Sequence, residues 1–249
     1  MQSLQKRRVH LMTLFQAEKI LMGGLVLVIL FMLYRGILAP VLSRIHHRKA
    51  PKVKTEDMDD LQRQGVLYGT FISALNRDRF GSLDSHIDYA GYRKVLKRQW
   101  DVVDHKSAIL ALNQLSVLEH STTFDFMLHS NFSEYERVIK KTAKLLDGCP
   151  YSEPEEFTTY GWDVVRLSAL AKWCFWLAYI SEEELNGYFT VCVQRCHALG
   201  RDWDEFAYSY LLGRTMHGFR PNNLPKVMKM CLPNLKKYPF KVEVATLEK

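Results

Sequence analysis

The chain has few of the residues that interrupt regular structure, with 13 glycines and 8 prolines among 249 residues. Because all-β folds need many turns, this scarcity argues against a chain of short strands. The five cysteines are an odd number without the dense spacing of a disulfide-rich secreted domain, so we expect free thiols in a reducing compartment. A content of 47% hydrophobic and 24% charged residues is typical of a folded protein.

The sequence also lacks the common motifs of phosphate loops, dinucleotide-binding turns, zinc proteases, serine hydrolases and calcium loops. Cys192 and Cys196 are one helical turn apart and could contact one metal ion. A structural zinc site needs four ligands, however, and no second cysteine pair is present. We therefore predict no metal and no cofactor, and we expect both thiols in the core.

Positive charge is concentrated near the N-terminus. Residues 1–54 hold ten Lys and Arg and one acid, Glu18, whereas the remaining 195 residues hold 24 basic and 26 acidic side chains. A domain that binds nucleic acid carries its own basic surface. The charge distribution therefore argues against nucleic acid as a partner and indicates basic residues that flank a membrane segment.

Residues 20–42 form the most apolar part of the chain, with Arg35 as their only charged residue. A helix of 23 residues is long enough to span a bilayer, and the Arg35 guanidinium can reach the headgroups at one interface. A cleaved signal peptide is the main alternative, but no clear cleavage site follows the apolar run. We predict a transmembrane helix at 20–42 that binds the lipid bilayer.

The predicted anchor divides the chain into a basic flank (1–19), the membrane helix, a basic linker (43–56) and a helical domain (57–249). Six Lys and Arg lie on the C-terminal side, with Arg35 inside the segment and five just after it, and four precede the segment. The positive-inside rule then predicts a single-pass protein whose domain lies in the cytoplasm.

Apolar residues recur at helical spacing throughout the domain, and the prediction is an all-α fold with an N-terminal transmembrane helix. Three pairs have the spacing of a helix capping box: Ser133 with Glu136, Ser181 with Glu184, and Asp202 with Glu205. Asp104 is a further candidate N-cap, and Gly148 a candidate left-handed residue after a helix end.

One group of polar side chains in the C-terminal half is a candidate site. It consists of two carboxylates, one phenol and two guanidiniums on two predicted helices: Asp163, Arg166, Glu205, Tyr210 and Arg214. Such a group could hold an anionic ligand, with Trp162 and Trp203 as candidate contact aromatics. Ion pairs that only orient the helices are the alternative, and this is the commoner use of such pairs inside helical bundles.

These residues fall in segments that resemble a known family. The segments are Trp100–Asp104, Trp162–Arg166, Tyr179–Glu184, Trp203–Phe206 and Tyr210–Arg214. Together they resemble the bacterial domain of unknown function 1266, over residues 90–220, although Asp101 and Glu119 stand where the family pattern has glycine. The resemblance implies a helical domain and a bacterial protein, hence the inner membrane. It implies no activity and no catalytic residues.

The function predicted from these observations is a membrane-tethered helical module that binds a protein partner, which it regulates or neutralises. Aromatic residues and arginines are typical of such contact surfaces. The alternative is an enzyme for a small anionic or phosphorylated substrate, with Asp163 or Glu205 as acid or base and Arg166 and Arg214 as anion clamps. A third hypothesis, nucleic-acid binding through the basic linker, predicts binding that is lost without residues 1–54.

Overall fold

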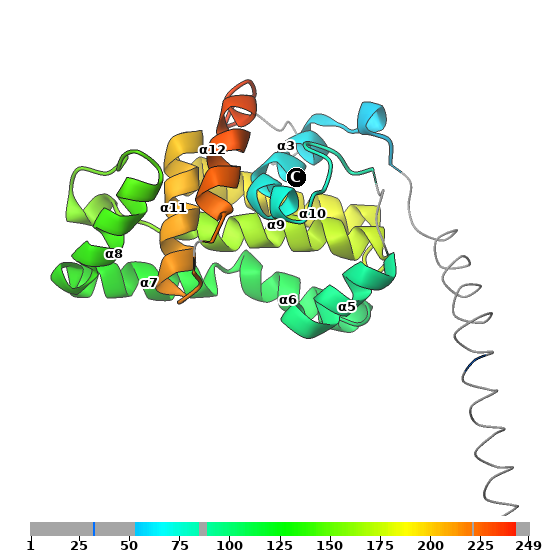
Figure 1. Ribbon diagram of the computed structural model, residues 1–249. Helices are drawn as coiled ribbons and strands as arrows, with labels where there is room; N and C mark the ends of the chain where they lie inside the picture. The colour runs from blue at the N-terminus through cyan, green and yellow to red at the C-terminus, as the bar shows by residue number, and fades with distance from the viewer. Residues whose placement is uncertain (1–31, 33–52, 85–88, 221, 243–249) are drawn as a thin grey trace, which may run out of the picture. The chain divides into compact units, whose positions relative to one another are not determined.

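The computed structural model describes residues 32, 53–84, 89–220 and 222–242, and their regular structure is entirely helical. This confirms the all-α prediction for the helical domain. The chain divides into two compact units, Met1–Lys49 and Ala50–Lys249, and the helices below belong to the second. In chain order they are η2 (Thr55–Asp57), α3 (Asp60–Tyr68), α4 (Thr70–Leu75), α5 (Tyr89–Trp100), α6 (His105–Ser116), α7 (Glu119–Ser130), α8 (Phe132–Leu145), η3 (Pro154–Glu156), α9 (Tyr160–Trp176), α10 (Glu182–Leu199), α11 (Trp203–Met216) and α12 (Leu224–Leu235) (Figure 1).

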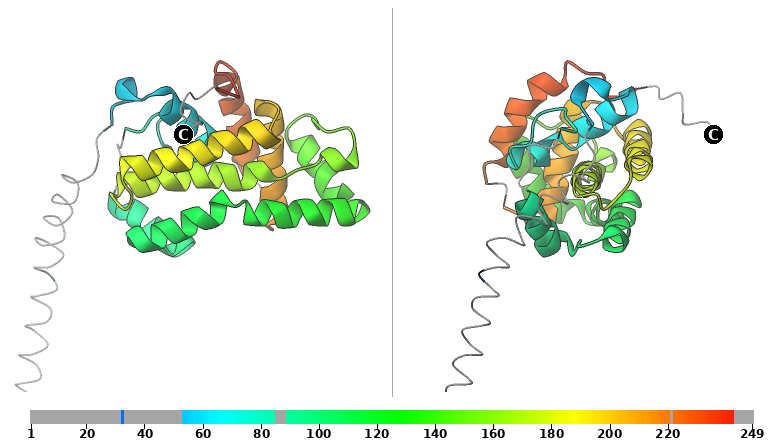
Figure 2. Two further views of the ribbon diagram at one scale, coloured as in Figure 1. Left: turned by 180° about the vertical axis from the view of Figure 1, so that it is seen from behind. Right: turned by 90° about the vertical axis from the view of Figure 1, so that its right-hand side faces the viewer.

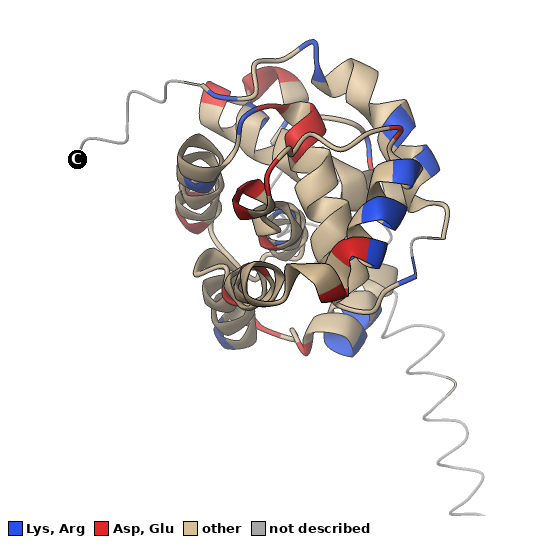
Figure 3. Cartoon of the chain, turned by 90° about the vertical axis from the view of Figure 1, so that its left-hand side faces the viewer, with Lys and Arg blue, Asp and Glu red and all other residues tan. Residues whose placement is uncertain are grey.

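The predicted membrane helix at 20–42 lies outside the described residues apart from Met32, as does most of the linker. Within the described parts of the chain, no helix is both long and apolar enough to cross a membrane. Acidic and basic segments both occur around the surface of the helical domain (Figure 3), as its nearly balanced charge requires. The membrane anchor stays a prediction.

The centre of the domain is α9, whose sequence is apolar on almost every side. A helix of this kind must be surrounded by other helices to keep its side chains from water. Seen along its axis, α9 is enclosed in this way (Figure 2), and it contacts α3, α4, α6, α7, α10 and α11. All of its 17 residues are buried except Arg166, which makes this arginine the one place where α9 reaches the surface.

The sequence predicts three of the helix starts correctly. Asp202 caps α11 by accepting from the amides of Asp204 and Glu205, although the Glu205 carboxylate does not return a bond to Asp202. The Ser181 hydroxyl accepts a hydrogen bond from the Glu184 amide at 3.1 Å, and the Glu184 carboxylate accepts one from the Ser181 amide at 2.7 Å. This confirms the capping box at the start of α10. Asp104 caps α6 as predicted, with Ser107 as the reciprocal partner.

The capping box predicted for Ser133 and Glu136 is wrong. Helix α8 begins at Phe132, and only Asn131 separates it from α7, so no extended residue is available to place Ser133 before the helix. Glu136 instead pairs with Lys140 one turn later.

Two aspartates occupy backbone conformations that favour glycine. After α8 the left-handed residue is Asp147, at φ 63°, and not the predicted Gly148. Asp101, which follows α5, has φ 54° and stands where the family resemblance expects glycine. Aspartate tolerates this region better than most residues, which explains how the turn after α5 keeps its geometry.

Candidate functional site

Two glycines bring α9 and α11 into close contact. A Cβ atom on Gly213 would lie 2.5 Å from the Cβ of Trp162, and one on Gly161 would lie 2.8 Å from the Phe206 carbonyl oxygen. Real Cβ atoms are essentially never this close to another heavy atom. The absence of a side chain at both positions therefore lets the two helices cross closely, and their polar side chains meet near the C-terminal end of α11.

Beside this crossing lies a cleft of about 610 Å³ between α4, α5, α9, α11 and the segment after α11. Neither aspartate nor glutamate is among its lining residues within the described chain. The cleft is lined by Ile72, Leu75, Asn76, Gln99, Trp100, Trp162, Arg166, Trp173, Arg214, His217 and Phe219. Two guanidiniums thus line a cleft whose described lining includes no carboxylate, although Arg166 pairs with Asp163 outside that lining.

Arg166 is held by aromatic rings and by one carboxylate. Its guanidinium carbon lies 4.4 Å from the ring centroid of Trp162 and 5.0 Å from that of Trp100. Its Nη1 donates to Asp163 Oδ1 at 3.0 Å. Burial lowers the pKa of Arg166, and the Asp163 charge opposes this shift, so the guanidinium stays protonated at neutral pH.

Two donors beside the cleft are buried without a hydrogen-bond partner among the described residues, the indole Nε1 of Trp162 and the Nε of Arg214. The Tyr210 ring stacks on Trp162 at 5.8 Å. Burial raises the pKa of Tyr210 to about 12, while the charge of Arg214, a hydrogen bond with the Arg214 side chain and the charge of Arg166 oppose the shift. With the guanidiniums of Arg166 and Arg214 in its lining, the cleft is suited to a ligand that accepts hydrogen bonds.

Asp163 belongs to the same crossing but does not line the cleft. Its carboxylate is fully buried and accepts hydrogen bonds from Arg166 and from the Ser121 amide, the latter at 2.8 Å. The Nδ1 atom of His120 is 3.7 Å away. A carboxylate with so many partners orients Arg166 and has no open side for substrate.

The structure separates Glu205 from the other candidates, so the prediction of one five-residue group is wrong. Glu205 is buried at the start of α11, where it accepts hydrogen bonds from Tyr151, Tyr160 and the Arg201 amide. It precedes Arg214 by nine residues, which places the two about 13 Å apart along the helix axis. Burial raises the pKa of Glu205, against the opposing effect of the tyrosine hydroxyls.

The structure adds two histidines that the sequence does not group. The rings of His120 and His217 have centroids 5.3 Å apart, although the residues are 97 positions apart in the chain. The His217 ring packs between Trp162 and Phe219, at 5.5 and 5.0 Å. Partial burial, Arg166 and His120 together lower the pKa of His217. Histidine is the side chain whose unperturbed pKa lies near neutrality, and His217 is the histidine among the described residues that line the cleft.

The second candidate contact aromatic, Trp203, is part of the core. Its side chain is buried, its indole donates to the Tyr238 carbonyl at 2.9 Å, and its ring packs against Phe240 at 5.1 Å. Cys192 and Cys196 are likewise buried, as expected for small apolar residues. In the described parts of the chain, no group of three or more His, Cys, Asp or Glu is placed to hold a metal ion.

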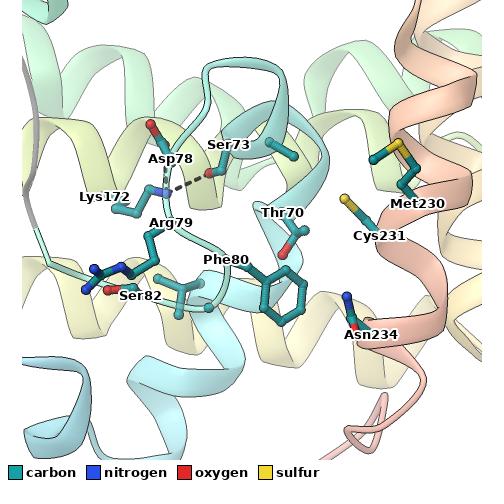
Figure 4. Close-up of a pocket in the computed structure, with 13 residues that line it drawn as sticks. Thr70, Ser73, Asp78, Arg79, Phe80, Ser82, Lys172, Met230, Cys231 and Asn234 are labelled. Atoms are coloured by element: carbon teal, nitrogen blue, oxygen red, sulfur yellow. Dashed lines mark hydrogen bonds and ion pairs between the residues drawn. The ribbon is translucent and has the colours of Figure 1, made fainter.

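Lys172 is a buried cation elsewhere on α9, beside a smaller pocket of about 190 Å³ (Figure 4). The Lys172 ammonium is 2.9 Å from Asp78 and donates to the Ser73 hydroxyl at 2.7 Å. Asp78 also accepts hydrogen bonds from the Trp173 indole at 3.0 Å and from Tyr92. This network was not predicted from the sequence, although a lone lysine in an apolar helix is a signal, because lysine is almost never fully buried without a partner.

A family model described as "Protein of unknown function (DUF1266)" matches residues 95–232. No curated protein and no solved structure matches the chain. The matched range includes the whole crossing of α9 and α11, with Trp162, Arg166 and Arg214, but not the α4 side of the cleft.

Proposed function

We propose, for a chain that belongs to the DUF1266 family of proteins of unknown function, that the helical domain binds a small anionic ligand in the cleft beside α9 and α11. One observation supports this above all. Arg166 and Arg214 line a cleft whose described lining includes no carboxylate, and the buried Trp162 Nε1 and Arg214 Nε beside it have no hydrogen-bond partner among the described residues.

The energetic reason is the cost of leaving buried donors unpaired, about 1–3 kcal/mol for each group. The Arg214 Nε and the Trp162 indole N–H both fall in this class. An anion with several oxygens can accept hydrogen bonds from the guanidiniums that line the cleft and compensate the charge of Arg214, while Asp163 compensates that of Arg166. Arginine is well suited to this role because its flat guanidinium donates two parallel hydrogen bonds to phosphate or carboxylate.

The proposal keeps only part of the enzyme hypothesis. We keep Arg166 and Arg214 as proposed anion clamps, but the carboxylates of Asp163 and Glu205 are enclosed by their own hydrogen-bond partners. Neither lines the cleft, so neither is placed to exchange a proton with a ligand there. We therefore propose binding, and assign no acid or base role to the two carboxylates.

The test is the affinity of the full-length protein, kept in mild detergent, for inorganic phosphate by isothermal titration calorimetry. We expect the Arg166→Gln and Arg214→Gln variants each to bind about tenfold to a hundredfold more weakly, because each loses a charged hydrogen bond worth about 1.5–3 kcal/mol. Arg137→Gln is the matched control, since Arg137 is exposed on α8 and does not line the cleft. Equal affinities in all four proteins, or no binding by the unsubstituted chain, would contradict the proposal.

We also propose that residues 20–42 tether the domain to a bacterial inner membrane, with the domain in the cytoplasm. The support is the uneven charge of the sequence, with ten basic residues around the apolar run and a nearly neutral remainder. Membrane fractions washed with alkaline carbonate should retain the full-length chain and lose a chain that begins at residue 50. A reporter enzyme that works only in the cytoplasm should be active when fused to Lys249, and one that works only outside the cytoplasm should be inactive there. Recovery of the intact chain in the soluble fraction would contradict the tether.

A protein partner remains a second candidate, favoured by exposed apolar side chains on α6 and at its two ends. Leu110 of α6 is 64% exposed, and Val103 and Val117, which flank the helix, are 47% and 64% exposed. A partner could cover these side chains. A photo-crosslinker at position 117 should capture one reproducible partner in cells, and Leu110→Glu should abolish that capture. Absence of any reproducible product would remove this candidate.

A further inference from the structure

We propose that the ligand of the cleft is a nucleoside monophosphate, bound with its phosphate on the arginines and its base against the apolar and amide side chains of the lining. This rests on the proposed anion-binding function and adds the chemical class of the ligand. The observation behind it is that the lining contains two chemically different sets of residues, a cationic set and an apolar set with two amides, of which an inorganic anion would use only the first.

The cationic set is Arg166 and Arg214, with His217 beside them. Arg166 is held against the rings of Trp162 and Trp100, and the guanidinium carbon of Arg214 lies 5.1 Å from the ring centroid of Phe219. Rings on the faces of a guanidinium leave its edges, which carry the N–H donors, to meet a ligand. This set therefore fits a compact group with several acceptor oxygens, such as a phosphate.

The other set is apolar with two side-chain amides. Ile72 and Leu75 of α4 and Trp173 of α9 form apolar walls, while Asn76 and Gln99 bring the amides. The Asn76 amide nitrogen already donates to the Ile72 carbonyl at 3.0 Å, which leaves its oxygen as an acceptor. The Gln99 side chain is exposed and makes no hydrogen bond within the described residues, so it can both donate and accept.

A nucleobase matches this set in both respects. Its faces are flat and stack on indole rings or apolar side chains, and its edge carries donors and acceptors that side-chain amides bind. The cleft volume of about 610 Å³ also falls within the usual range of small-molecule pockets, and a phosphate alone would leave most of it to water. A sugar phosphate without a base would leave the amides and apolar walls unused.

The experiment compares four kinds of probe on the full-length protein in detergent: inorganic phosphate, ribose 5-phosphate, adenosine, and the monophosphates of adenosine, guanosine, cytidine and uridine. At least one nucleotide should bind about tenfold to a hundredfold more tightly than ribose 5-phosphate, which is the range that stacking of one base contributes. Adenosine should bind more weakly than its monophosphate, because it lacks the group held by the arginines.

Two variants separate the two sets of residues. Gln99→Ala should weaken nucleotide binding severalfold and leave ribose 5-phosphate binding unchanged, whereas Arg214→Gln should weaken both. If ribose 5-phosphate binds as tightly as every nucleotide, the nucleotide inference is wrong while the anion site stands. If no phosphorylated probe binds, both proposals are wrong.

Discussion

Lys172 and Arg166 are cations of the same helix, six residues apart, and each has a carboxylate and an indole ring as partners, yet the groups beside them differ. The Lys172 ammonium also donates to the Ser73 hydroxyl, and Asp78 is in turn bound by Trp173 and Tyr92. Beside Arg166, in contrast, the Trp162 Nε1 and the Arg214 Nε have no partner within the described chain. A buried charge whose neighbours are all paired leaves no donor for a ligand, whereas unpaired donors beside a cation indicate a place for one.

The largest expected effect concerns Lys172, whose neighbouring polar groups are all paired. Lys172→Met should lower the free energy of unfolding by about 3–5 kcal/mol, because it leaves the Asp78 carboxylate buried without its counter-ion. Arg166→Gln should cost less, about 1–2 kcal/mol, since Asp163 keeps the Ser121 amide as a donor. Urea unfolding followed by tryptophan fluorescence measures both. A double variant, Lys172→Met with Asp78→Asn, should recover part of the loss, and equal losses for the two single variants would break the comparison.

The next effect concerns the crossing that builds the cleft. Gly213→Ala should lower the free energy of unfolding by about 1–2 kcal/mol and weaken phosphate binding, because the new methyl group must push α11 away from Trp162. Gly187→Ala is the matched control, since nothing lies within 4 Å of a Cβ atom at that position of α10. The control should be slightly stabilised, by up to about 1 kcal/mol, through helix propensity alone. A Gly213→Ala variant as stable as the control would show that the close crossing is dispensable.

A smaller effect should appear in the pH dependence of anion binding. In the free protein, the pKa of His217 is lowered by partial burial and by the charges of Arg166 and His120, while Asp163 opposes this. A bound anion favours the imidazolium and so raises this pKa, which means that binding takes up a proton. The affinity for sulfate, which does not titrate in this range, should therefore increase up to about tenfold as the pH falls from 8 to 5. The increase should vanish in His217→Gln and persist in His105→Gln, and a flat profile in the unsubstituted protein would argue against contact between His217 and the anion.

The smallest effect concerns Glu205, a buried acid whose oxygens are all occupied. Burial raises its pKa in the folded protein above the value in the unfolded chain, so the folded state binds the proton more tightly. The contribution of Glu205 to stability should then be greatest at low pH and decrease as the pH rises through the interval between the two pKa values. Relative to the unsubstituted protein, Glu205→Gln should become more stable as the pH rises from 4 to 8. The tyrosine hydroxyls oppose the shift, which keeps the effect small. The measurement is urea unfolding of both proteins at several pH values, and a stability difference that does not change with pH would contradict it.

Local sequence patterns predict the helices well because helix formation depends on neighbours within a few residues. Ser181 with Glu184, and Asp104, mark helix starts that the structure confirms. The pattern at Ser133 and Glu136 is equally good but is overridden, since the single residue between α7 and α8 leaves no room for an extended cap.

The candidate site could be predicted only in part. The i, i+3 spacing of Asp163 and Arg166 is local and leads directly to their ion pair. Grouping Arg166 with Arg214 required the assumption that their helices cross. The same assumption wrongly added Glu205, which precedes Arg214 by nine residues on α11 and does not line the cleft. The contacts of His217 with His120, and of Lys172 with Asp78, join residues 97 and 94 positions apart, which no local pattern in a single sequence specifies.

Arg166 is the single residue of α9 that is not buried, and α9 touches most of the other helices. A ligand that fixes this side chain therefore acts on the central helix and not on a peripheral loop. Its binding energy would be added to the stability of the whole domain, so that slow amide hydrogen exchange would become slower in helices that do not line the cleft, such as α3 and α10. Occupancy of the cleft would in this way raise the free energy of unfolding of the domain without any change of shape.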